Sequence, residues 1–251
     1  MTDDPRITET PMDAQIDAIV KDAGLTQPLT SSQAPRDALD TQEDLIRDAV
    51  LRMGTLVEEA IRLASRSLQR HDAALALEVI TGDAVINETQ RAVSRLISVT
   101  IATQNPVARD LRYLLTLDHV TYELERIGDH AASVAKQVIK LAPEPPLKGY
   151  VHLPEMAERA AALVHGVLRA LVEADAVRAR EVAAEDDEID RLYHATFDVA
   201  VQLMREDPAN VERGTRIVIA SHYLERIGDR ATNIAEDIVY LVTGDVEDLN
   251  P

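Results

Sequence analysis

The sequence predicts an all-α protein built as two pseudo-symmetric antiparallel three-helix bundles, with six long helices that arose from an internal duplication. Apolar residues recur at three- and four-residue steps from residue 41 onward, as on the buried face of a helix. The same pattern returns after about 100 residues, a repeat length that indicates duplication. The composition agrees with helices, because aromatic residues make up only 3% of the chain.

The N-terminal segment, residues 1–40, is expected to be a flexible acidic tail. It is rich in proline, and only residues 13–22 have enough apolar side chains for a short helix. Its polar start lacks the features of a signal peptide, and no apolar run approaches the roughly 20 residues that span a bilayer. We therefore expect a cytoplasmic protein without membrane insertion.

The first three-helix repeat is expected at residues 41–142. Thr41 and Asp44 resemble a capping box at the start of its first helix. Asp72 is placed to cap the second helix, and Asn105, followed by proline, is placed to cap the third, which then runs to about Leu141. The predicted buried stripe of the first helix contains Leu45, Ala49, Met53, Leu56, Ala60 and Leu63.

A proline-rich linker, residues 143–154, is expected to separate the first repeat from the second. The second repeat spans residues 155–243, and residues 244–251 form a C-terminal tail. Asp175 takes the place of the first repeat's capping aspartate, and an Asp-Pro pair at Asp207 takes the place of the earlier Asn-Pro pair. The same order of helices is therefore predicted twice.

The closest match between the repeats lies in their last helices. The run Leu-Glu-Arg-Ile-Gly-Asp at residues 124–129 reappears at residues 224–229. Core packing explains the repeated apolar residues, but it does not explain why acidic residues recur at the same two positions. The apolar positions that follow are also repeated, with Ala131, Val134, Val138 and Leu141 corresponding to Ala231, Ile234, Ile238 and Leu241.

Acidic residues from two helices are expected to meet in each repeat. Glu125 and Asp129 lie four residues apart, as do Glu225 and Asp229, so each pair shares one face of its helix. Because consecutive helices run antiparallel, the preceding helix brings its own polar pair to the same level. These companion pairs are Asp83 with Asn87 in the first repeat and Asp186 with Asp190 in the second.

Oxygen ligands gathered in this way suit hard cations, with iron, manganese, magnesium or calcium as candidates and zinc as another. The ligand types do not select among these metals. The competing interpretation is a solvated acidic helix face, which the residues alone leave open. The duplication favours a metal site, since ordinary surface charge changes faster between repeats than core positions do.

Other function classes are disfavoured. A net charge of −18 opposes binding to nucleic acid, and the absence of cysteine excludes thiolate metal sites. No histidine follows a glutamate by three residues, as di-iron carboxylate enzymes require, and neither Gly-x-Ser-x-Gly nor a P-loop occurs. We therefore expect no catalysis. Lone histidines such as His165 and His194 are expected to be surface or core residues, and His130 is a weaker ligand candidate because Arg230 replaces it in the second repeat.

The paired Leu-Glu-Arg-Ile-Gly-Asp segments resemble those of the PhoU family of phosphate-signalling regulators. The second copy, LERIGDRATNIAEDIVYL at residues 224–241, carries the more specific match. The resemblance implies multinuclear clusters of iron or zinc, with manganese or magnesium as alternatives, at the acidic motifs described above. It also implies that Asn233 and Glu236 extend the second cluster. The first copy has Ser133 and Lys136 there, and a lysine opposes a cation, so the first cluster is expected to hold fewer ions or none.

The resemblance implies a regulatory function without catalysis. Members of the PhoU family act as negative regulators of the phosphate-starvation response and are thought to link a high-affinity phosphate ABC transporter to its sensor histidine kinase. We therefore expect the transporter's ATPase subunit and the phosphate-sensing kinase as partners, and a homodimer as the oligomeric state. The alternative is a metal-free helical scaffold that only binds partner proteins.

Overall fold

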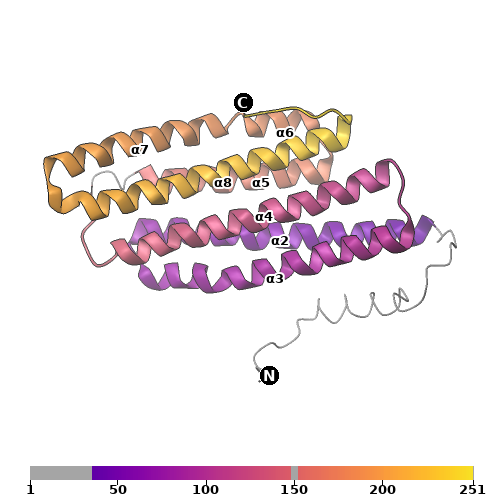
Figure 1. Cartoon of the computed structure of the whole chain (residues 1–251), viewed down its shortest axis with the longest axis horizontal. Coiled ribbons are helices and arrows are strands. Elements are labelled where there is room, and N and C mark those ends of the chain that lie inside the picture. The colour runs from indigo at the N-terminus through magenta and orange to yellow at the C-terminus, as the bar shows by residue number, and fades with distance from the viewer. Residues whose placement is uncertain (1–35, 148–151, 251) are drawn as a thin grey trace, which may run out of the picture.

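The computed structural model describes residues 36–147 and 152–250, in which all of the regular structure is helical (Figure 1). Five long rods are single helices, and the sixth rod is divided into two helices. In chain order the helices are α2 (Arg36–Arg70), α3 (Ala73–Gln104), α4 (Arg109–Leu141), α5 (His152–Glu173), α6 (Ala176–Ala183), α7 (Asp186–Glu206), the short 3-10 helix η2 (Pro208–Asn210) and α8 (Val211–Thr243).

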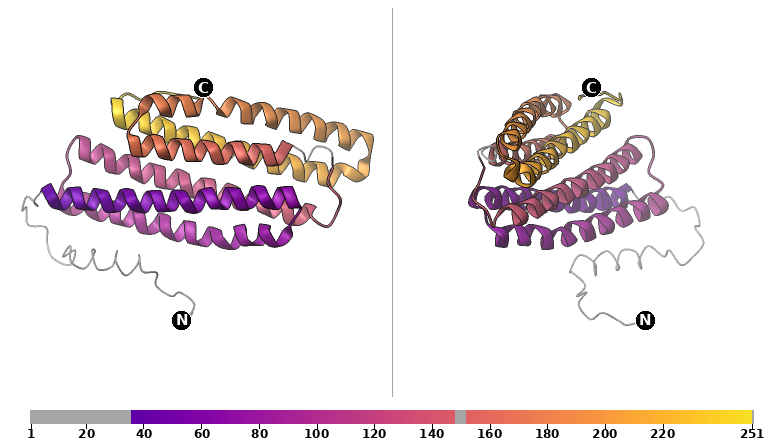
Figure 2. Two further views of the ribbon diagram at one scale, coloured as in Figure 1. Left: turned by 180° about the vertical axis from the view of Figure 1, so that it is seen from behind. Right: turned by 60° about the vertical axis from the view of Figure 1, so that its left-hand side comes forward.

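Two three-helix bundles lie side by side along their length (Figures 1 and 2). The first contains α2, α3 and α4, and the second contains α5, the divided rod α6–α7, and α8. Helix α2 packs against α5, and α4 packs against α8, so the contact between bundles pairs equivalent helices of the two repeats. This arrangement confirms the predicted all-α architecture.

The core is made largely of the aliphatic side chains that the repeat pattern identified, but in α2 only Ala49 and Met53 of the predicted stripe are buried. The repeated positions of α4 and α8 are buried, and only Leu241 is partly exposed. In α2, however, Leu56 is 39% exposed, whereas Ile46, Val57 and Ile61 are fully buried. Two apolar stripes run side by side on this helix. Its packing against α3, α4 and α5 buries the stripe next to the predicted one.

The caps of α3 and α6 are as predicted, but that of α4 is not. The carboxylate of Asp72 accepts a hydrogen bond from the Ala74 N–H at 2.8 Å, and that of Asp175 accepts one from the Val177 N–H at 2.9 Å. The prediction that Asn105 caps the third helix is wrong. Asn105 ends α3 in the left-handed conformation with a φ of 48°, which asparagine tolerates well, and α4 begins only at Arg109.

Helix α2 begins at Arg36, five residues before the predicted start, because Leu39 is already buried against the core. The predicted tail can be compared only over residues 36–40, since residues 1–35 lie outside the described part of the chain. Helix α5 begins inside the predicted linker, with Pro154 in its first turn, where proline costs no hydrogen bond.

The C-terminal residues lie along the second bundle. Gly244 ends α8 with a φ of 84°. The Arg180 guanidinium then donates two hydrogen bonds to Glu247, at 2.6 and 2.8 Å. The backbone N–H of Leu249 donates to Glu236 Oε1 at 2.9 Å. The segment predicted as a tail therefore contacts both α6 and α8.

Candidate carboxylate clusters

The first carboxylate cluster consists of Asp83 and Asn87 on α3 with Glu125 and Asp129 on α4. The Asn87 amide donates to Asp83 Oδ2 at 3.0 Å. Burial, reinforced by the charge of Asp129, raises the pKa of Asp83. Burial also raises the pKa of Glu125, with further contributions from Asp129 and Asp83. The structure thus brings the three predicted carboxylates of this repeat into one electrostatic environment.

The second carboxylate cluster consists of Asp186 and Asp190 on α7 with Glu225 and Asp229 on α8. Burial, followed by the charges of Asp190, Asp229 and Glu225, raises the pKa of Asp186 to about 7. Burial, followed by the charges of Asp229 and Asp190, raises the pKa of Glu225 to about 7. Four predicted acidic residues therefore meet in this repeat, and nearby Arg226 and His194 offset their mutual repulsion only in part.

Both clusters contain buried oxygens without a hydrogen-bond partner, and at the same two positions. In the first cluster these atoms are Asp83 Oδ1 and Glu125 Oε2; in the second they are Asp186 Oδ1 and Glu225 Oε2. Leaving a buried polar atom unpaired costs about 1 to 3 kcal/mol, and more if the group is charged. Because the same two positions recur in both repeats, a packing defect confined to one repeat does not account for them.

The glycine of the repeated motif makes room for the carboxylate on the facing helix. A Cβ added at Gly228 would overlap Asp186 Oδ1. A Cβ added at Gly128 would lie 3.0 Å from Ile86 Cδ1 and 3.5 Å from Asp83 Oδ1. The repetition of this glycine inside a helix was a sequence signal for such a close approach, and no prediction used it.

The two clusters differ in the burial of the aspartate on the helix that precedes the motif helix. Asp83 lies within the uninterrupted helix α3 and is partly buried. Asp186 is the first residue of α7, directly after the interruption between α6 and α7, and is only 3% exposed. Its Oδ2 accepts a hydrogen bond from the Asn250 amide at 3.4 Å. The C-terminal segment therefore reaches the second cluster, and among the described residues nothing equivalent occurs at the first.

Positive charges surround the first cluster more closely. Arg126 and Arg226 lie at equivalent places, each with Nη1 3.2 Å from the Oδ2 of the motif aspartate. The first cluster has two further cations, because Lys136 lowers the pKa of Asp83 and Arg91 lowers that of Glu125. Lys136 therefore acts on this cluster in the direction that the sequence suggested.

Asn233 and Glu236 have other partners in the structure. Asn233 donates to Glu123 Oε2 at 3.3 Å, and Arg230 Nη1 lies 3.3 Å from the same oxygen. Glu123 comes from α4 and is only 2% exposed, so this group joins the two bundles. Glu236 accepts from Leu249, as described above. The structure does not bring these two predicted residues into the second cluster, and sequence reasoning missed the buried Glu123.

His130 also belongs to the contact between the bundles. Its ring stacks on Tyr223 with centroids 5.8 Å apart. Burial, with the nearby charge of Arg230 next in importance, lowers the pKa of His130 to about 4. The ring is therefore neutral near pH 7.

The carboxylates are close but have not converged on a common point. Within residues 36–147 and 152–250, no group of three or more His, Asp or Glu side chains is arranged to hold a metal ion. Their type nevertheless fits a hard cation, and the unpaired oxygens of both clusters supply acceptors for one. Binding would require carboxylate side chains to rotate toward the ion.

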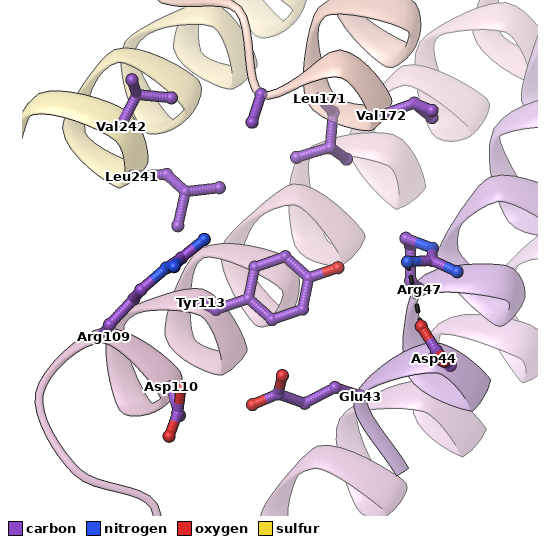
Figure 3. A pocket seen from close by; sticks show the side chains of 11 residues that line it. Glu43, Asp44, Arg47, Arg109, Asp110, Tyr113, Leu171, Val172, Leu241 and Val242 are labelled. Atoms are coloured by element: carbon purple, nitrogen blue, oxygen red, sulfur yellow. Dashed lines mark ion pairs between the residues drawn. The ribbon is translucent and has the colours of Figure 1, made fainter. Parts of the chain in front are cut away.

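A separate cavity of about 510 Å³ lies where α2 and α4 begin and where α5 and α8 end. Figure 3 shows Tyr113 across its centre, with Arg47 and Arg109 on opposite sides. Arg47 Nη1 lies 3.0 Å from Asp44 Oδ1, so that charge is already paired. None of the residues of the two carboxylate clusters lines this cavity.

The fold and the clusters together define a class of duplicated helical-bundle proteins with an acidic pair on the last helix of each repeat. The PhoU domain model matches residues 50–138 and 153–238. The chain belongs to the PhoU family. Among the helices that the structure describes, none is both long and apolar enough to cross a bilayer.

Relatives match over nearly their full length. The chain is 33% identical over 216 residues to the phosphate-specific transport system accessory protein PhoU homolog of Clostridium acetobutylicum, covering 86% of this chain and 99% of that protein. The crystal structure of PhoU from Pseudomonas aeruginosa superposes with a TM-score of 0.79 at 35% identity, covering 82% of this chain and 99% of that one. The phosphate transport system regulatory protein PhoU from Streptococcus pneumoniae gives a TM-score of 0.77 at 29% identity, covering 84% and 99%.

Proposed function

We propose that this protein is a negative regulator of the phosphate-starvation response, acting as a metal-binding adaptor without catalysis. It binds the ATPase subunit of a phosphate ABC transporter and a phosphate-sensing histidine kinase, and works in the cytoplasm as a homodimer. The observation that carries this proposal is the near full-length similarity to proteins named as accessory to phosphate-specific transport. The carboxylate clusters add the second part of the proposal, which is metal binding.

The residues that would hold metal are the four of each carboxylate cluster. Iron, zinc, manganese and magnesium ions all bind carboxylate oxygens as ligands. A bound cation would neutralise the repulsion within a cluster and satisfy the unpaired oxygens of both helices. Because each cluster spans two helices, the ion would also fix α3 against α4, or α7 against α8.

Regulation requires that the adaptor distinguish states of its partners. A ligand that binds two states equally well shifts nothing between them. The adaptor must therefore bind more tightly to the kinase conformation that silences the response when phosphate is plentiful. Helices held rigidly by their clusters would present a defined surface for that discrimination.

The partner proposal is tested by pull-down of the full chain with the ATPase subunit and with the kinase, at high and at low phosphate. Binding to both partners, with a phosphate-dependent difference, is the expected result. Failure to bind either partner in either condition would contradict it. Asp229→Asn serves as the test variant, and Asp198→Asn, an exposed aspartate of α7, is the matched control.

The alternative function is a metal-free helical scaffold. One observation favours it: the carboxylates of the described residues are not arranged around a common point. Elemental analysis of protein purified without chelator separates the two. The scaffold predicts no stoichiometric metal and no change on Glu225→Ala, whereas the metal-binding adaptor predicts bound metal that is lost on Asp229→Ala.

A further inference from the structure

Two histidines border the second carboxylate cluster at positions where the first cluster has none. His194 on α7 corresponds to Arg91 on α3, and His222 on α8 corresponds to Tyr122 on α4. The acidic residues themselves are nearly the same in the two repeats. The neighbours of the carboxylates therefore make the chemical difference between the clusters.

The ring of His222 faces the carboxylate of Glu225. Its Nδ1 lies 3.2 Å from Glu225 Oε2, yet that oxygen has no hydrogen-bond partner. Two ligand atoms bound to one ion at about 2.1 Å, at octahedral or tetrahedral angles, lie about 2.9 to 3.4 Å apart. The nitrogen and the oxygen are therefore spaced as two ligands of one ion would be.

The ring of His194 is held in the tautomer that a metal ligand needs. Its Nδ1 lies 2.8 Å from the backbone carbonyl oxygen of Asp190. A carbonyl oxygen can only accept, so Nδ1–H donates and Nε2 keeps its lone pair. Metal-binding histidines typically use their second nitrogen in this way. When protonated, His194 lowers the pKa of both Asp190 and Glu225, so its ring lies near carboxyls of both helices.

Aromatic rings hold the two imidazoles on this side of the bundle. The ring centroid of Tyr193 lies 5.4 Å from that of His194 and 6.1 Å from that of His222. Tyr223 lies 6.0 Å from His222 on the same helix. Tyr193 thus contacts both histidines, one on its own helix and one on α8.

An observation independent of the histidines also points to a ligand at this place. Asp186 is 3% exposed, and its Oδ1 is buried without a partner on the side facing Gly228 of the motif. A carboxylate this deeply buried needs a donor or a cation. No donor reaches this oxygen within the described residues.

At the two equivalent positions the first cluster has no imidazole. Arg91 and Lys136 bring fixed positive charge to Glu125 and Asp83, respectively. Tyr122 occupies the position of the second histidine. The guanidinium carbon of Arg126 lies over the Tyr122 ring, 4.9 Å from the ring centroid. An arginine therefore occupies the place of one imidazole, and a tyrosine packed against a guanidinium occupies the place of the other.

We propose that His194 and His222 are metal ligands that make the second carboxylate cluster a mixed nitrogen–oxygen site. Such a site prefers a transition-metal ion, Zn²⁺ above all, to Mg²⁺ and Ca²⁺, which are held by oxygen alone. The first cluster remains an oxygen-only site of lower affinity. This inference rests on the proposed metal binding, and it reverses the sequence-based expectation that His194 is not a ligand.

The test measures Zn²⁺ and Mg²⁺ binding to the full chain after removal of metal, by equilibrium dialysis with elemental analysis. The variant His194→Gln with His222→Gln should lose at least about tenfold in Zn²⁺ affinity and leave Mg²⁺ affinity unchanged. With Co²⁺ as the probe, the visible absorption bands should shift when the nitrogen ligands are removed. The matched control, His152→Gln with His165→Gln, removes two histidines from α5 and should change neither result.

Folding does not confound this test, since both histidines are exposed, and thermal unfolding in chelator checks that the variant matches the wild type. Equal Zn²⁺ affinity of the variant and the wild type overturns the inference and leaves the proposed metal binding intact. No metal binding by the wild type overturns both. A second variant, Arg91→His with Tyr122→His and Lys136→Ala, should gain Zn²⁺ affinity at the first cluster, and no gain would count against the inference.

Discussion

Replacing Asp186 with asparagine should stabilise the metal-free protein, and increasingly so as the pH rises. Asp186 is 3% exposed, and burial with nearby carboxylates raises its pKa from 3.8 to about 7. Well below the unfolded pKa both states carry the proton, so the carboxyl costs nothing. Between the unfolded and the folded pKa only the unfolded state releases its proton, so stability falls as the pH rises and levels off above the folded pKa.

The magnitude follows from the two pKa values. A difference of about three pH units corresponds to about 4 kcal/mol once both states are ionised. At about pH 5 the unfolded carboxyl is already ionised and part of this cost is present, so about 2 to 3 kcal/mol remains to be lost by about pH 8. Asparagine does not titrate. The advantage of Asp186→Asn over the wild type should therefore grow by about 2 to 3 kcal/mol across this range.

The assay is urea unfolding in the presence of chelator, followed by far-ultraviolet circular dichroism at the two pH values. Asp198→Asn, an exposed aspartate on the same helix, is the matched control and should show a difference from the wild type that does not change with pH. If Asp186→Asn also keeps a constant difference from the wild type, the carboxyl is not held in a buried, unpaired state, and the reasoning is refuted.

Two further substitutions test the packing of the second cluster and the contact between the bundles. Gly228→Ala adds a Cβ that overlaps the buried carboxylate facing it and should cost about 1 to 3 kcal/mol. Gly82→Ala, which meets nothing within 4 Å, should stabilise the protein slightly; equal thermal unfolding of the two variants would contradict this. Arg230→Ala leaves Glu123, 2% exposed, without its arginine partner and should cost about 3 kcal/mol in urea unfolding. Arg169→Ala removes a surface ion pair whose arginine side chain is 51% exposed, and a cost of Arg230→Ala no larger than that of Arg169→Ala would show that the buried pair does not join the bundles.

The repeat was the most informative part of the sequence. Duplicated apolar positions predicted two bundles, and the duplicated acidic pairs predicted clusters between facing helices. Both predictions depend on helical spacing and on antiparallel pairing, which are properties of the backbone. The caps at Asp72 and Asp175 were predictable for the same reason, since a short side chain reaches only its own first turn.

Features that depend on tertiary packing were not predictable. Asparagine suits both the start of a helix and a left-handed residue after its end, so the role of Asn105 was ambiguous. The interruption before Asp186 falls at Ala184 and Glu185, residues that favour helix, so no local signal marks it. The partners of Asn233 and Glu236 come from the other bundle and from the C-terminal segment, which no spacing within one helix reveals.

The central claim is that the two carboxylate clusters exist to bind metal, and elemental analysis of the full chain purified without chelator tests it most directly. The account predicts stoichiometric metal in the wild type, lost from the second cluster on Asp229→Asn and unaffected by the exposed substitution Asp198→Asn. A wild-type protein with no stoichiometric metal, and none taken up from iron, zinc or manganese solutions, would contradict it.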